Sequence, residues 1–508
     1  MRGPIITSTA HPALIGKSGI ASPSIRWKLL LPLVLWLMLW AGQNTGVEVI
    51  FLAQTTIGKL HGYRSLLPLL AALLALWTIF KRGSISPVPL RGALGFMAVY
   101  ALLGIPGSLF VSPRPEIALG WWAAYVSVFL ILGATVHGPD SITRICAIIS
   151  LNRLVVGAVL LVLVTIGQDV ISSSRLRPDI DRMPGYSVLT IRPEVGGMPM
   201  VRASGVGRYA AVLAIAALAR LRSSAGWRFP YWALLLSFSL YIIVLYHSRS
   251  AVIGAAICTL GVLALRAKGQ AKVFFLSATL LLAVWLSVSG LPVPAARYLA
   301  RGADPATQYG GWTGRMNLWE AAFPLVKDSP LIGFGFHGDR LMTRGSAVHN
   351  AWLHALLQSG LLGTLCFAGG FITGWILLFR ALRLLPVLPA KQKVVLIESA
   401  GVLGFFTLRT VSESSGAYFG VDWLLLAPIF AYLQILNHQY RLGEARAHFP
   451  YGMAVCRASS SNASTARGPG RRFLMMAASV RRAQHNPEAM KTRGAERISA
   501  VPEQPESH

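Results

Sequence analysis

The sequence contains little charge for its length. Aspartate, glutamate, lysine and arginine together make up 13% of its 508 residues, whereas these four types make up about 25% of an ordinary soluble protein. Hydrophobic residues account for 54%, and the mean hydropathy is +0.56. This composition excludes an ordinary soluble domain and predicts a polytopic membrane protein.

Acidic residues are the scarcer of the charged types, with 19 Asp and Glu against 47 Lys and Arg and a formal net charge of +28. The basic residues are scattered between apolar runs and form no stripe, so we expect them to face anionic membrane lipids and not nucleic acid. The few cysteines lie far apart, at Cys146, Cys258, Cys366 and Cys456. Their spacing predicts neither a disulfide framework nor a metal cluster.

The alternating pattern of an outer-membrane barrel is also missing, so the apolar runs indicate helices and an all-α fold. Runs long enough to cross a bilayer recur along the chain, and we expect about twelve membrane-spanning helices. Their centres are expected in residues 27–43, 64–81, 92–111, 116–136, 144–168, 205–221, 230–247, 250–266, 272–290, 350–379, 393–411 and 417–437. Lysine and arginine gather in the short connections on one side, which the positive-inside rule makes cytoplasmic together with both termini.

From these runs we divide the chain into three parts. A cytoplasmic N-terminal segment (1–26) precedes the membrane domain (27–437), and a basic, disordered cytoplasmic tail (438–508) follows it. No cleavable signal peptide is expected. Two long connections, about 169–204 and 291–348, fall on the opposite, outer face, and loops of this length in a compact protein are usually functional.

The second long connection contains GGWTGRMNLWEAAFPLVKDSPLIGFGF, residues Gly310 to Phe336. We expect a glycine turn and then an amphipathic helix on which Arg315 and Trp319, four residues apart, share a face. Its two prolines end or bend the helix, and the glycines of GFGF permit a tight path that brings backbone amides near a ligand. The alternative is an interfacial helix with Trp319 at headgroup depth and Arg315 snorkelling to the surface.

HNAWLHALLQSGLLG follows, from His349 to Gly363. Asn350 is predicted to cap a helix that begins at Ala351, which places His349 just outside the positive end of that helix. Such an end attracts phosphate, and an imidazole beside it can donate to an anion or accept a proton. His354 lies about one turn further on. The alternative is a hydrogen-bonded structural histidine.

Two shorter segments add arginines at the outer ends of predicted spans. HSRSAVIG contains Arg249, and VRASGVGRYAA contains Arg202 and Arg208. A charge beside hydrocarbon is costly unless it snorkels or is compensated by a partner or an anion. Because all four segments share the outer face, the arginines and His349 suit a diphosphate on a polyprenyl carrier, whose tail stays in the bilayer.

With these motifs assembled, the chain resembles the O-antigen ligase and O-antigen polymerase superfamily of bacterial inner-membrane glycosyltransferases. The resemblance is most specific over about residues 241–379, where SRSAVIGA, GRMNLWEAAFPLVKDSPLIGFGF and HNAWLHALLQSGLLG occur in family order. It implies an integral-membrane glycosyltransferase fold and transfer of a glycan from undecaprenyl diphosphate on the periplasmic side.

The resemblance also implies roles for individual residues. Arg249, Arg315 and His349 carry over as catalytic residues, the arginines on the diphosphate and the histidine at the acceptor or phosphate. The substrate-binding candidates are Arg202, Arg208, Trp319, His337, Asn350 and His354. Neither a metal nor another cofactor is expected. Where many relatives have a proline-asparagine pair after the arginine-glycine segment, this chain has Gly207 and Arg208.

Three functions remain open at this point. A ligase would transfer the glycan to lipid A core or another surface acceptor, whereas an exopolysaccharide or O-antigen polymerase would extend a second carrier-linked repeat from the same donor. A lipid-linked sugar flippase or other transporter is the alternative of another class. The unlike halves of the sequence and the nearly charge-free interiors of the spans favour an enzyme.

Overall fold

The computed structural model describes residues 23–43, 46, 49–50, 56–83, 86, 90–138, 140–169, 188–191, 199–221, 223–246, 248–267, 269–271, 274–275, 277–278, 315–343 and 347–448. The predicted segments 1–26 and 438–508, most of the 272–290 span and the start of the second long connection fall largely outside these residues. The chain divides into two compact units, Met1–Gln439 and Tyr440–His508.

Helices dominate the described residues, as the sequence predicts. They are α1 (Pro23–Gly42), α3 (Thr56–Tyr63), the 3-10 turn η1 (Arg64–Leu66), α4 (Leu67–Arg82), α5 (Gly92–Pro106), the π-helical turn η3 (Gly107–Val111), α6 (Pro115–Thr135), α7 (Ser141–Ile166), α8 (Ala203–Leu221), α9 (Arg228–Leu245), α10 (Arg249–Arg266), α14 (Arg315–Asp328), α15 (Gly338–Met342), α16 (Ala351–Leu382), α17 (Ala390–Arg409) and α18 (Val421–His448). Each of the other eleven predicted spans therefore coincides with a helix, and most of 272–290 lies outside the described residues.

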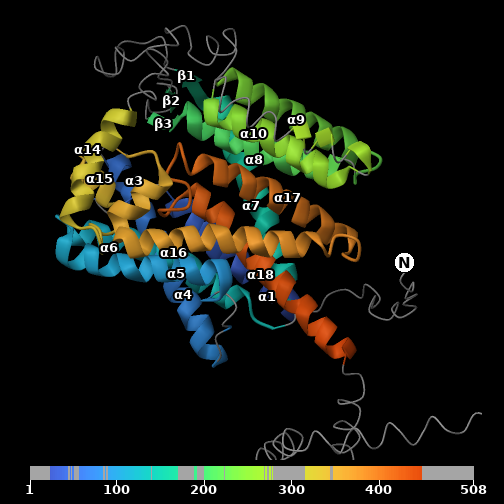
Figure 1. Cartoon of the computed structure of the whole chain (residues 1–508), viewed down its shortest axis with the longest axis horizontal. Helices are drawn as coiled ribbons and strands as arrows, with labels where there is room; N and C mark the ends of the chain where they lie inside the picture. The colour runs from blue at the N-terminus through green and yellow to red at the C-terminus, as the bar shows by residue number, and fades with distance from the viewer. Residues whose placement is uncertain are drawn as a thin grey trace, which may run out of the picture. The chain divides into compact units, whose positions relative to one another are not determined.

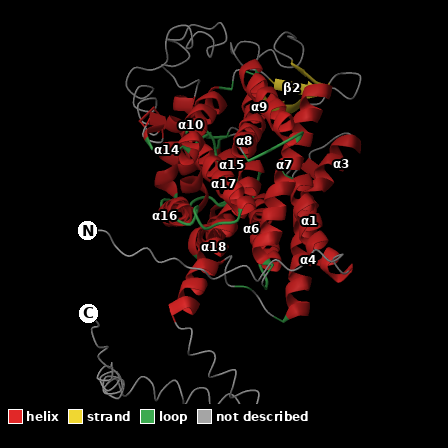
Figure 2. Cartoon of the chain, turned by 90° about the vertical axis from the view of Figure 1, so that its right-hand side faces the viewer, coloured by secondary structure: helices red, strands yellow, loops and turns green. Residues whose placement is uncertain are grey.

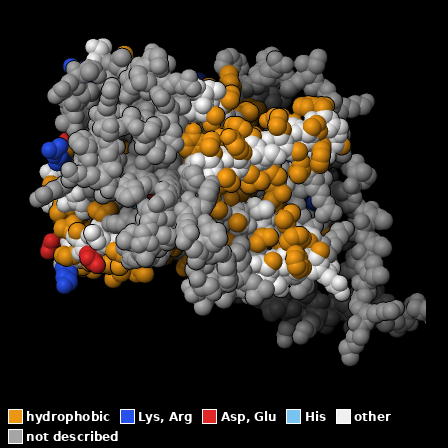
Figure 3. Space-filling view, turned by 90° about the horizontal axis from the view of Figure 1, so that it is seen from above, with side chains coloured by type: hydrophobic (Ala, Val, Ile, Leu, Met, Phe, Trp, Pro, Cys, Tyr) orange, Lys and Arg blue, Asp and Glu red, His pale blue; other side chains and the backbone are white. Residues whose placement is uncertain are grey.

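Six of the described helical segments are long and apolar enough to cross a membrane: Lys59–Arg82, Gly92–Val111, Pro115–Thr135, Ser141–Thr165, Arg228–Leu245 and Ala351–Leu382. Leu29–Gly42 and Ser250–Leu265 are shorter apolar helices. Large apolar side chains such as Trp77, Phe80 and Phe110 are 69%, 76% and 81% exposed, and apolar groups cover much of the described surface in Figure 3. Lipid accounts for so much exposed apolar surface, so the chain is a multi-pass membrane protein.

A small sheet interrupts the helical pattern. The strands β1 (Gly167–Asp169), β2 (Val188–Ile191) and β3 (Pro199–Arg202) pair antiparallel in the order β1-β2-β3 within the first long connection. The sequence predicted no strand here, because strands of three or four residues are too short to leave a clear alternating pattern. β3 leads directly into α8 and carries Arg202 at its end.

The first unit is built from contacting helices. α16 packs along α5, and α8 contacts α9, α10 and α17 (Figure 1). Figure 2 shows α1, α4, α6 and α7 side by side. An aromatic core lies among α5, α6 and α18: the ring centroids of Tyr100 and Tyr125 are 5.9 Å apart, and Tyr125 stacks on Trp423 at 4.8 Å. α14 and α15 contact α16 and lie beside its left-hand end in Figure 1.

The helix α16 is broken at Gly360, which has φ 62° and ψ −166°. The loop after α14 fills the break. Three backbone hydrogen bonds join loop and helix: Phe334 N to Leu357 O (2.6 Å), Gly335 N to Gln358 O (2.9 Å) and Leu361 N to Pro330 O (2.8 Å). These bonds satisfy backbone groups that the break would otherwise leave unpaired.

This arrangement corrects one expectation. We expected the GFGF glycines to bring backbone amides near a ligand, but the amides of Phe334 and Gly335 donate to carbonyls of α16. Gly333 and Gly335 do have the positive φ values, 66° and 81°, that a tight path requires. Gly333 therefore lies close against α16 at its break, and Gly335 lies close against Ser108 in η3. α14 also continues through Pro324 and ends at Asp328.

Candidate functional site

The C-terminal turn of α17 joins the N-termini of two other helices. Thr410 O accepts a hydrogen bond from Ala351 N (2.8 Å), and Val411 O accepts one from Asn350 Nδ2 (3.1 Å). On its other side, Arg409 Nη1 donates to Ser250 Oγ at the start of α10 (3.0 Å). The segments around His349 and Arg249, distant in sequence, are thus held against the same turn.

The predicted cap of α16 is confirmed. Asn350 Oδ1 accepts hydrogen bonds from the backbone amides of Trp352 (3.0 Å) and Leu353 (2.9 Å), which satisfies two of the amides that a helix leaves unpaired at its start. His349 precedes the cap with φ 48°, a left-handed conformation that is uncommon for residues other than glycine. Its Nδ1 lies 3.1 Å from Glu413 Oε2. The structure therefore places an imidazole beside a carboxylate at the positive end of α16.

Trp319 fixes α14 against this region. Its Nε1 donates to Val348 O (2.8 Å), one residue before His349, and its ring packs on a cluster that includes Ala322, Val348 and Leu353. The indole N–H thus contacts protein and ties α14 to the segment before His349. Arg315 begins α14 one turn before Trp319; its side chain lies outside the described residues.

Arg208 is buried near the N-terminus of α8, with 9% of its surface exposed. Its Nη1 donates to Asp422 Oδ1 at 2.7 Å, and Ser415 Oγ donates to Asp422 Oδ2 at 2.7 Å. Gly207 explains how α8 comes so close to α10, because a Cβ there would collide with the side chains of Ser248 and Ala251. Gly207 therefore allows the close helix spacing around Arg208.

Further charged residues, which the sequence analysis missed, surround Arg208. Arg409 is only 3% exposed and lies within electrostatic reach of Arg208, Glu413 and Asp422. Tyr418 lies in the same region, with the Arg340 guanidinium 5.8 Å from its ring centre. We call Arg208, Arg340, Arg409, Tyr418, Glu413 and Asp422 the charged cluster.

A signal for these residues exists in the sequence. Arg409, Glu413 and Asp422 lie at the outer ends of the spans predicted in 393–411 and 417–437. Under the derived topology that is the face that also carries His349. A charge at the end of an apolar run is ordinary, however, so the signal alone does not distinguish a buried cluster from snorkelling side chains.

His354 and His337 belong to a buried network beside the charged cluster, with the ring centres of His354 and Tyr418 5.5 Å apart. His354 Nδ1 lies 2.9 Å from Asp339 Oδ2, and Val348 N donates to the same oxygen at 3.3 Å. The Gln358 amide orientation that satisfies all its neighbours accepts from His354 Nε2 (2.6 Å) and donates to Tyr100 Oη (2.5 Å). These contacts tie α15 to α16 and α5.

Burial and neighbouring charges shift the pKa values of two groups in this network. Burial by itself would raise the pKa of Asp339, but His354 and Arg340 hold it well below its usual range. His337 has φ 64° and stacks on Trp121 with ring centres 4.7 Å apart. Burial, with Arg340 nearby, lowers the pKa of His337 to about 3, so this ring is neutral at pH 7. Both histidines therefore contact protein groups in an arrangement that orders the segment before His349.

The structure thus places four sequence candidates around the α17 turn: Arg208, Trp319, His349 and Asn350. Arg249 contributes its backbone there as the first residue of α10, but the side chains of Arg202, Arg249 and Arg315 lie outside the described residues.

The described residues do not include Asp179 and Asp181, a pair of carboxylates two residues apart in the first long connection. Since carboxylate oxygens bind divalent cations, a reaction without metal stays a prediction.

Residues 232–368 match the protein-family model described as O-antigen ligase. The matched segment contains most of α9, all of α10, α14 and α15, and the first part of α16, which includes the break at Gly360. It overlaps the region, about 241–379, on which the resemblance was based, and that expectation is confirmed. The family is one of membrane glycosyltransferases. No curated protein matches the chain.

Proposed function

We propose that this chain, a member of the O-antigen ligase superfamily, transfers a glycan from undecaprenyl diphosphate to an acceptor hydroxyl on the periplasmic face of the bacterial inner membrane. Lipid A core is the acceptor we favour, because the matching family is described as O-antigen ligase. The observation that carries the proposal is His349, placed on Glu413 at the positive end of α16 and beside the charged cluster.

The proposed reaction assigns each group a task. The acceptor oxygen attacks the anomeric carbon of the donor, the bond from that carbon to the diphosphate oxygen breaks, and the acceptor proton passes to His349. Glu413 on Nδ1 orients the imidazole and stabilises the proton that it takes. Negative charge then grows on the departing undecaprenyl diphosphate.

Arginines stabilise that charge in the proposal. Arg208 and Arg409 are buried and held by Asp422 and Ser250, so little reorganisation is needed when the diphosphate leaves. Arg249 and Arg315 start the two helices next to this region and are proposed to complete the diphosphate site. Guanidinium groups suit the task because their fork of donors matches phosphate oxygens.

The test is complementation of a strain that lacks the gene. We expect His349→Ala to abolish transfer while the protein remains inserted and abundant. His438→Ala is the matched control, since His438 is exposed on α18 and about 24 Å along that helix from Asp422. Unchanged surface glycan in the His349 variant would refute the site assignment.

The same glycolipid gel separates the candidate reactions. Loss of a ligase leaves unsubstituted acceptor and accumulating carrier-linked polymer. Loss of a polymerase leaves acceptors that bear a single repeat, provided a separate ligase is present. Repeats trapped on the cytoplasmic leaflet would indicate a flippase instead and would overturn the proposed chemistry.

A further inference from the structure

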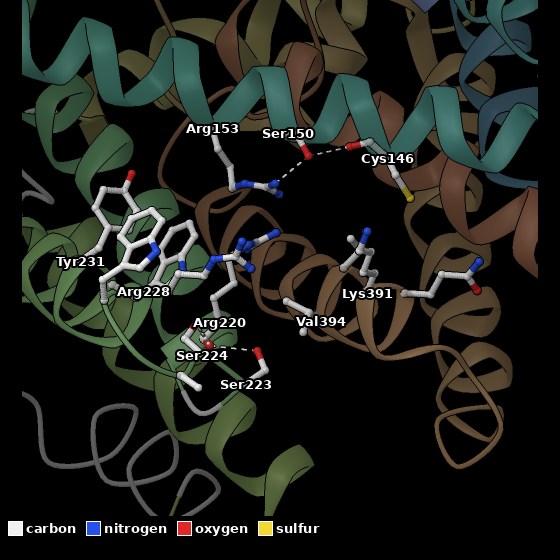
Figure 4. Close-up of a pocket in the computed structure, with 15 residues that line it drawn as sticks. Cys146, Ser150, Arg153, Arg220, Ser223, Ser224, Arg228, Tyr231, Lys391 and Val394 are labelled. Carbon is white, nitrogen blue, oxygen red and sulfur yellow. Dashed lines mark hydrogen bonds between the residues drawn. The ribbon is translucent and has the colours of Figure 1, made fainter. Parts of the chain in front are cut away.

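A cavity of about 850 Å³ lies at the other end of α8 and α17 from the charged cluster. Its walls come from the first half of α7, the turn between α8 and α9, the start of α9 and the start of α17. Figure 4 shows Arg153, Arg220 and Lys391 extending into the space between these elements. None of the sequence candidates lines it, and the volume is in the range of ligand sites.

Two of the lining arginines share one buried carboxylate. Glu398 is 3% exposed, and it pairs with Arg153 Nη1 at 2.8 Å and with Arg220 Nη2 at 2.7 Å. Ser150 Oγ accepts a further hydrogen bond from Arg153 Nη2 (2.7 Å). Glu398 thus fixes both guanidinium groups but neutralises only one of the two charges.

Two more cationic side chains lie at the edge of the cavity. Arg228 and Lys391 line the cavity and are exposed. Within the described part of the chain, neither forms an ion pair. Four cationic side chains therefore surround the space against the single carboxylate of Glu398, and the surplus is positive. A cavity with this balance attracts an anion strongly.

Aromatic rings around the cavity indicate that it lies at the headgroup level of the membrane. Trp227, Tyr231 and Trp232 line it, and the Arg220 guanidinium lies 5.3 Å from the Trp232 ring centre. Trp227 is 74% exposed and Tyr231 is 49% exposed. Tryptophan and tyrosine gather at the headgroup level of a bilayer, and α9 continues from them with exposed apolar side chains such as Leu234.

We infer that this cavity binds the phosphate of an anionic lipid headgroup, with the lipid's acyl chains along the exposed face of α9. Guanidinium groups donate to phosphate oxygens from fixed positions, and basic pockets between membrane helices are suited to anionic headgroups. The site is separate from the glycan site, so the inference stands or falls independently of the proposed reaction.

The experiment titrates the purified full chain in detergent with phosphatidylglycerol or phosphatidylcholine and counts bound lipids by native mass spectrometry. Phosphatidylglycerol is expected to bind in preference. Arg228→Gln/Lys391→Gln removes the two rim charges without exposing Glu398 and should weaken this binding roughly 30-fold. Arg380→Gln/Arg383→Gln removes the same charge from exposed positions outside the cavity and should leave binding unchanged.

Two further arms make the result decisive. Thermal unfolding without lipid checks that both double variants fold like the parent chain. Inorganic phosphate and pyrophosphate are added as competitors. Equal binding of the two lipids, an equal loss in both double variants, or full displacement by millimolar inorganic phosphate would each overturn the lipid site; the last result would identify a soluble phosphate ligand instead.

Discussion

Gly207 allows the sharpest test of how the helices position the proposed site. In Gly207→Ala the new Cβ would lie 2.9 Å from Ala251 Cβ and still closer to Ser248 Cβ, whereas carbon atoms prefer about 3.5–4.0 Å. α8 and α10 must therefore separate by about 1 Å. Overpacking of this kind costs about 1–3 kcal/mol, and a displacement of about 1 Å in a catalytic group costs about 100-fold in rate.

Two assays measure these effects on purified protein: thermal unfolding in detergent and glycan transfer from the lipid-linked donor. The matched control is Gly261→Ala on α10, where an added Cβ meets nothing within 4 Å, and this variant should be stabilised by about 0.5–1 kcal/mol because alanine favours a helix. If the two alanine variants unfolded at the same temperature, the close approach of α8 and α10 would be refuted.

A second substitution should rescue the first. Ser248→Gly removes the side chain that the new Cβ would strike, and Ser248 makes no side-chain capping bond to α10. Glycine at such a position costs only a few tenths of a kcal/mol. The double variant Gly207→Ala/Ser248→Gly is thus expected to recover most of the lost stability and transfer. Failure of the rescue would mean that the damage arises from the remaining contact with Ala251 or inside α8.

Two more predictions concern buried charge. His337 has a pKa of about 3 in the folded chain against 6.5 as its ordinary value, so its contribution to stability is complete above pH 6.5 and is lost as pH falls towards 3, by up to about 1.4 kcal/mol per pH unit. His337→Asn, which tolerates the left-handed backbone, should flatten this slope in unfolding experiments; an unchanged slope would contradict the buried, neutral ring. Glu398→Gln should cost about 3–5 kcal/mol, because Arg153 and Arg220 lose their shared partner, and the exposed Glu320→Gln is the control, which should unfold like the parent chain.

The parts of the fold that depend on neighbouring residues could be predicted from the sequence. Apolar runs gave the positions of the helices, because each run meets the lipid by itself. Asn350 could be identified as a cap because the amides that it binds are two and three residues away. The family motifs located His349 and Trp319 in the same way, by local pattern.

Other features depend on segments that are distant in the sequence. Nothing around Gly360 indicates that residues 330–335 will fill a break in α16, because the three hydrogen bonds form only after both segments have folded. The pairing of Arg208 with Asp422 joins residues 214 positions apart. Similarly, the need for glycine at position 207 comes from the side chains of Ser248 and Ala251, which are distant in the sequence.

The two basic regions together constrain how deep the proposed glycan site lies. Arg208 and Arg220 are on the same helix, twelve residues and so about 18 Å apart. If the aromatic rings around Arg220 mark the inner headgroup level, Arg208 lies within a hydrocarbon core about 30 Å thick, near its middle. A guanidinium at that depth requires a partner, which Asp422 supplies. The diphosphate of a lipid-linked donor would then be bound below the outer headgroups, where low dielectric strengthens its attraction to Arg208 and Arg409.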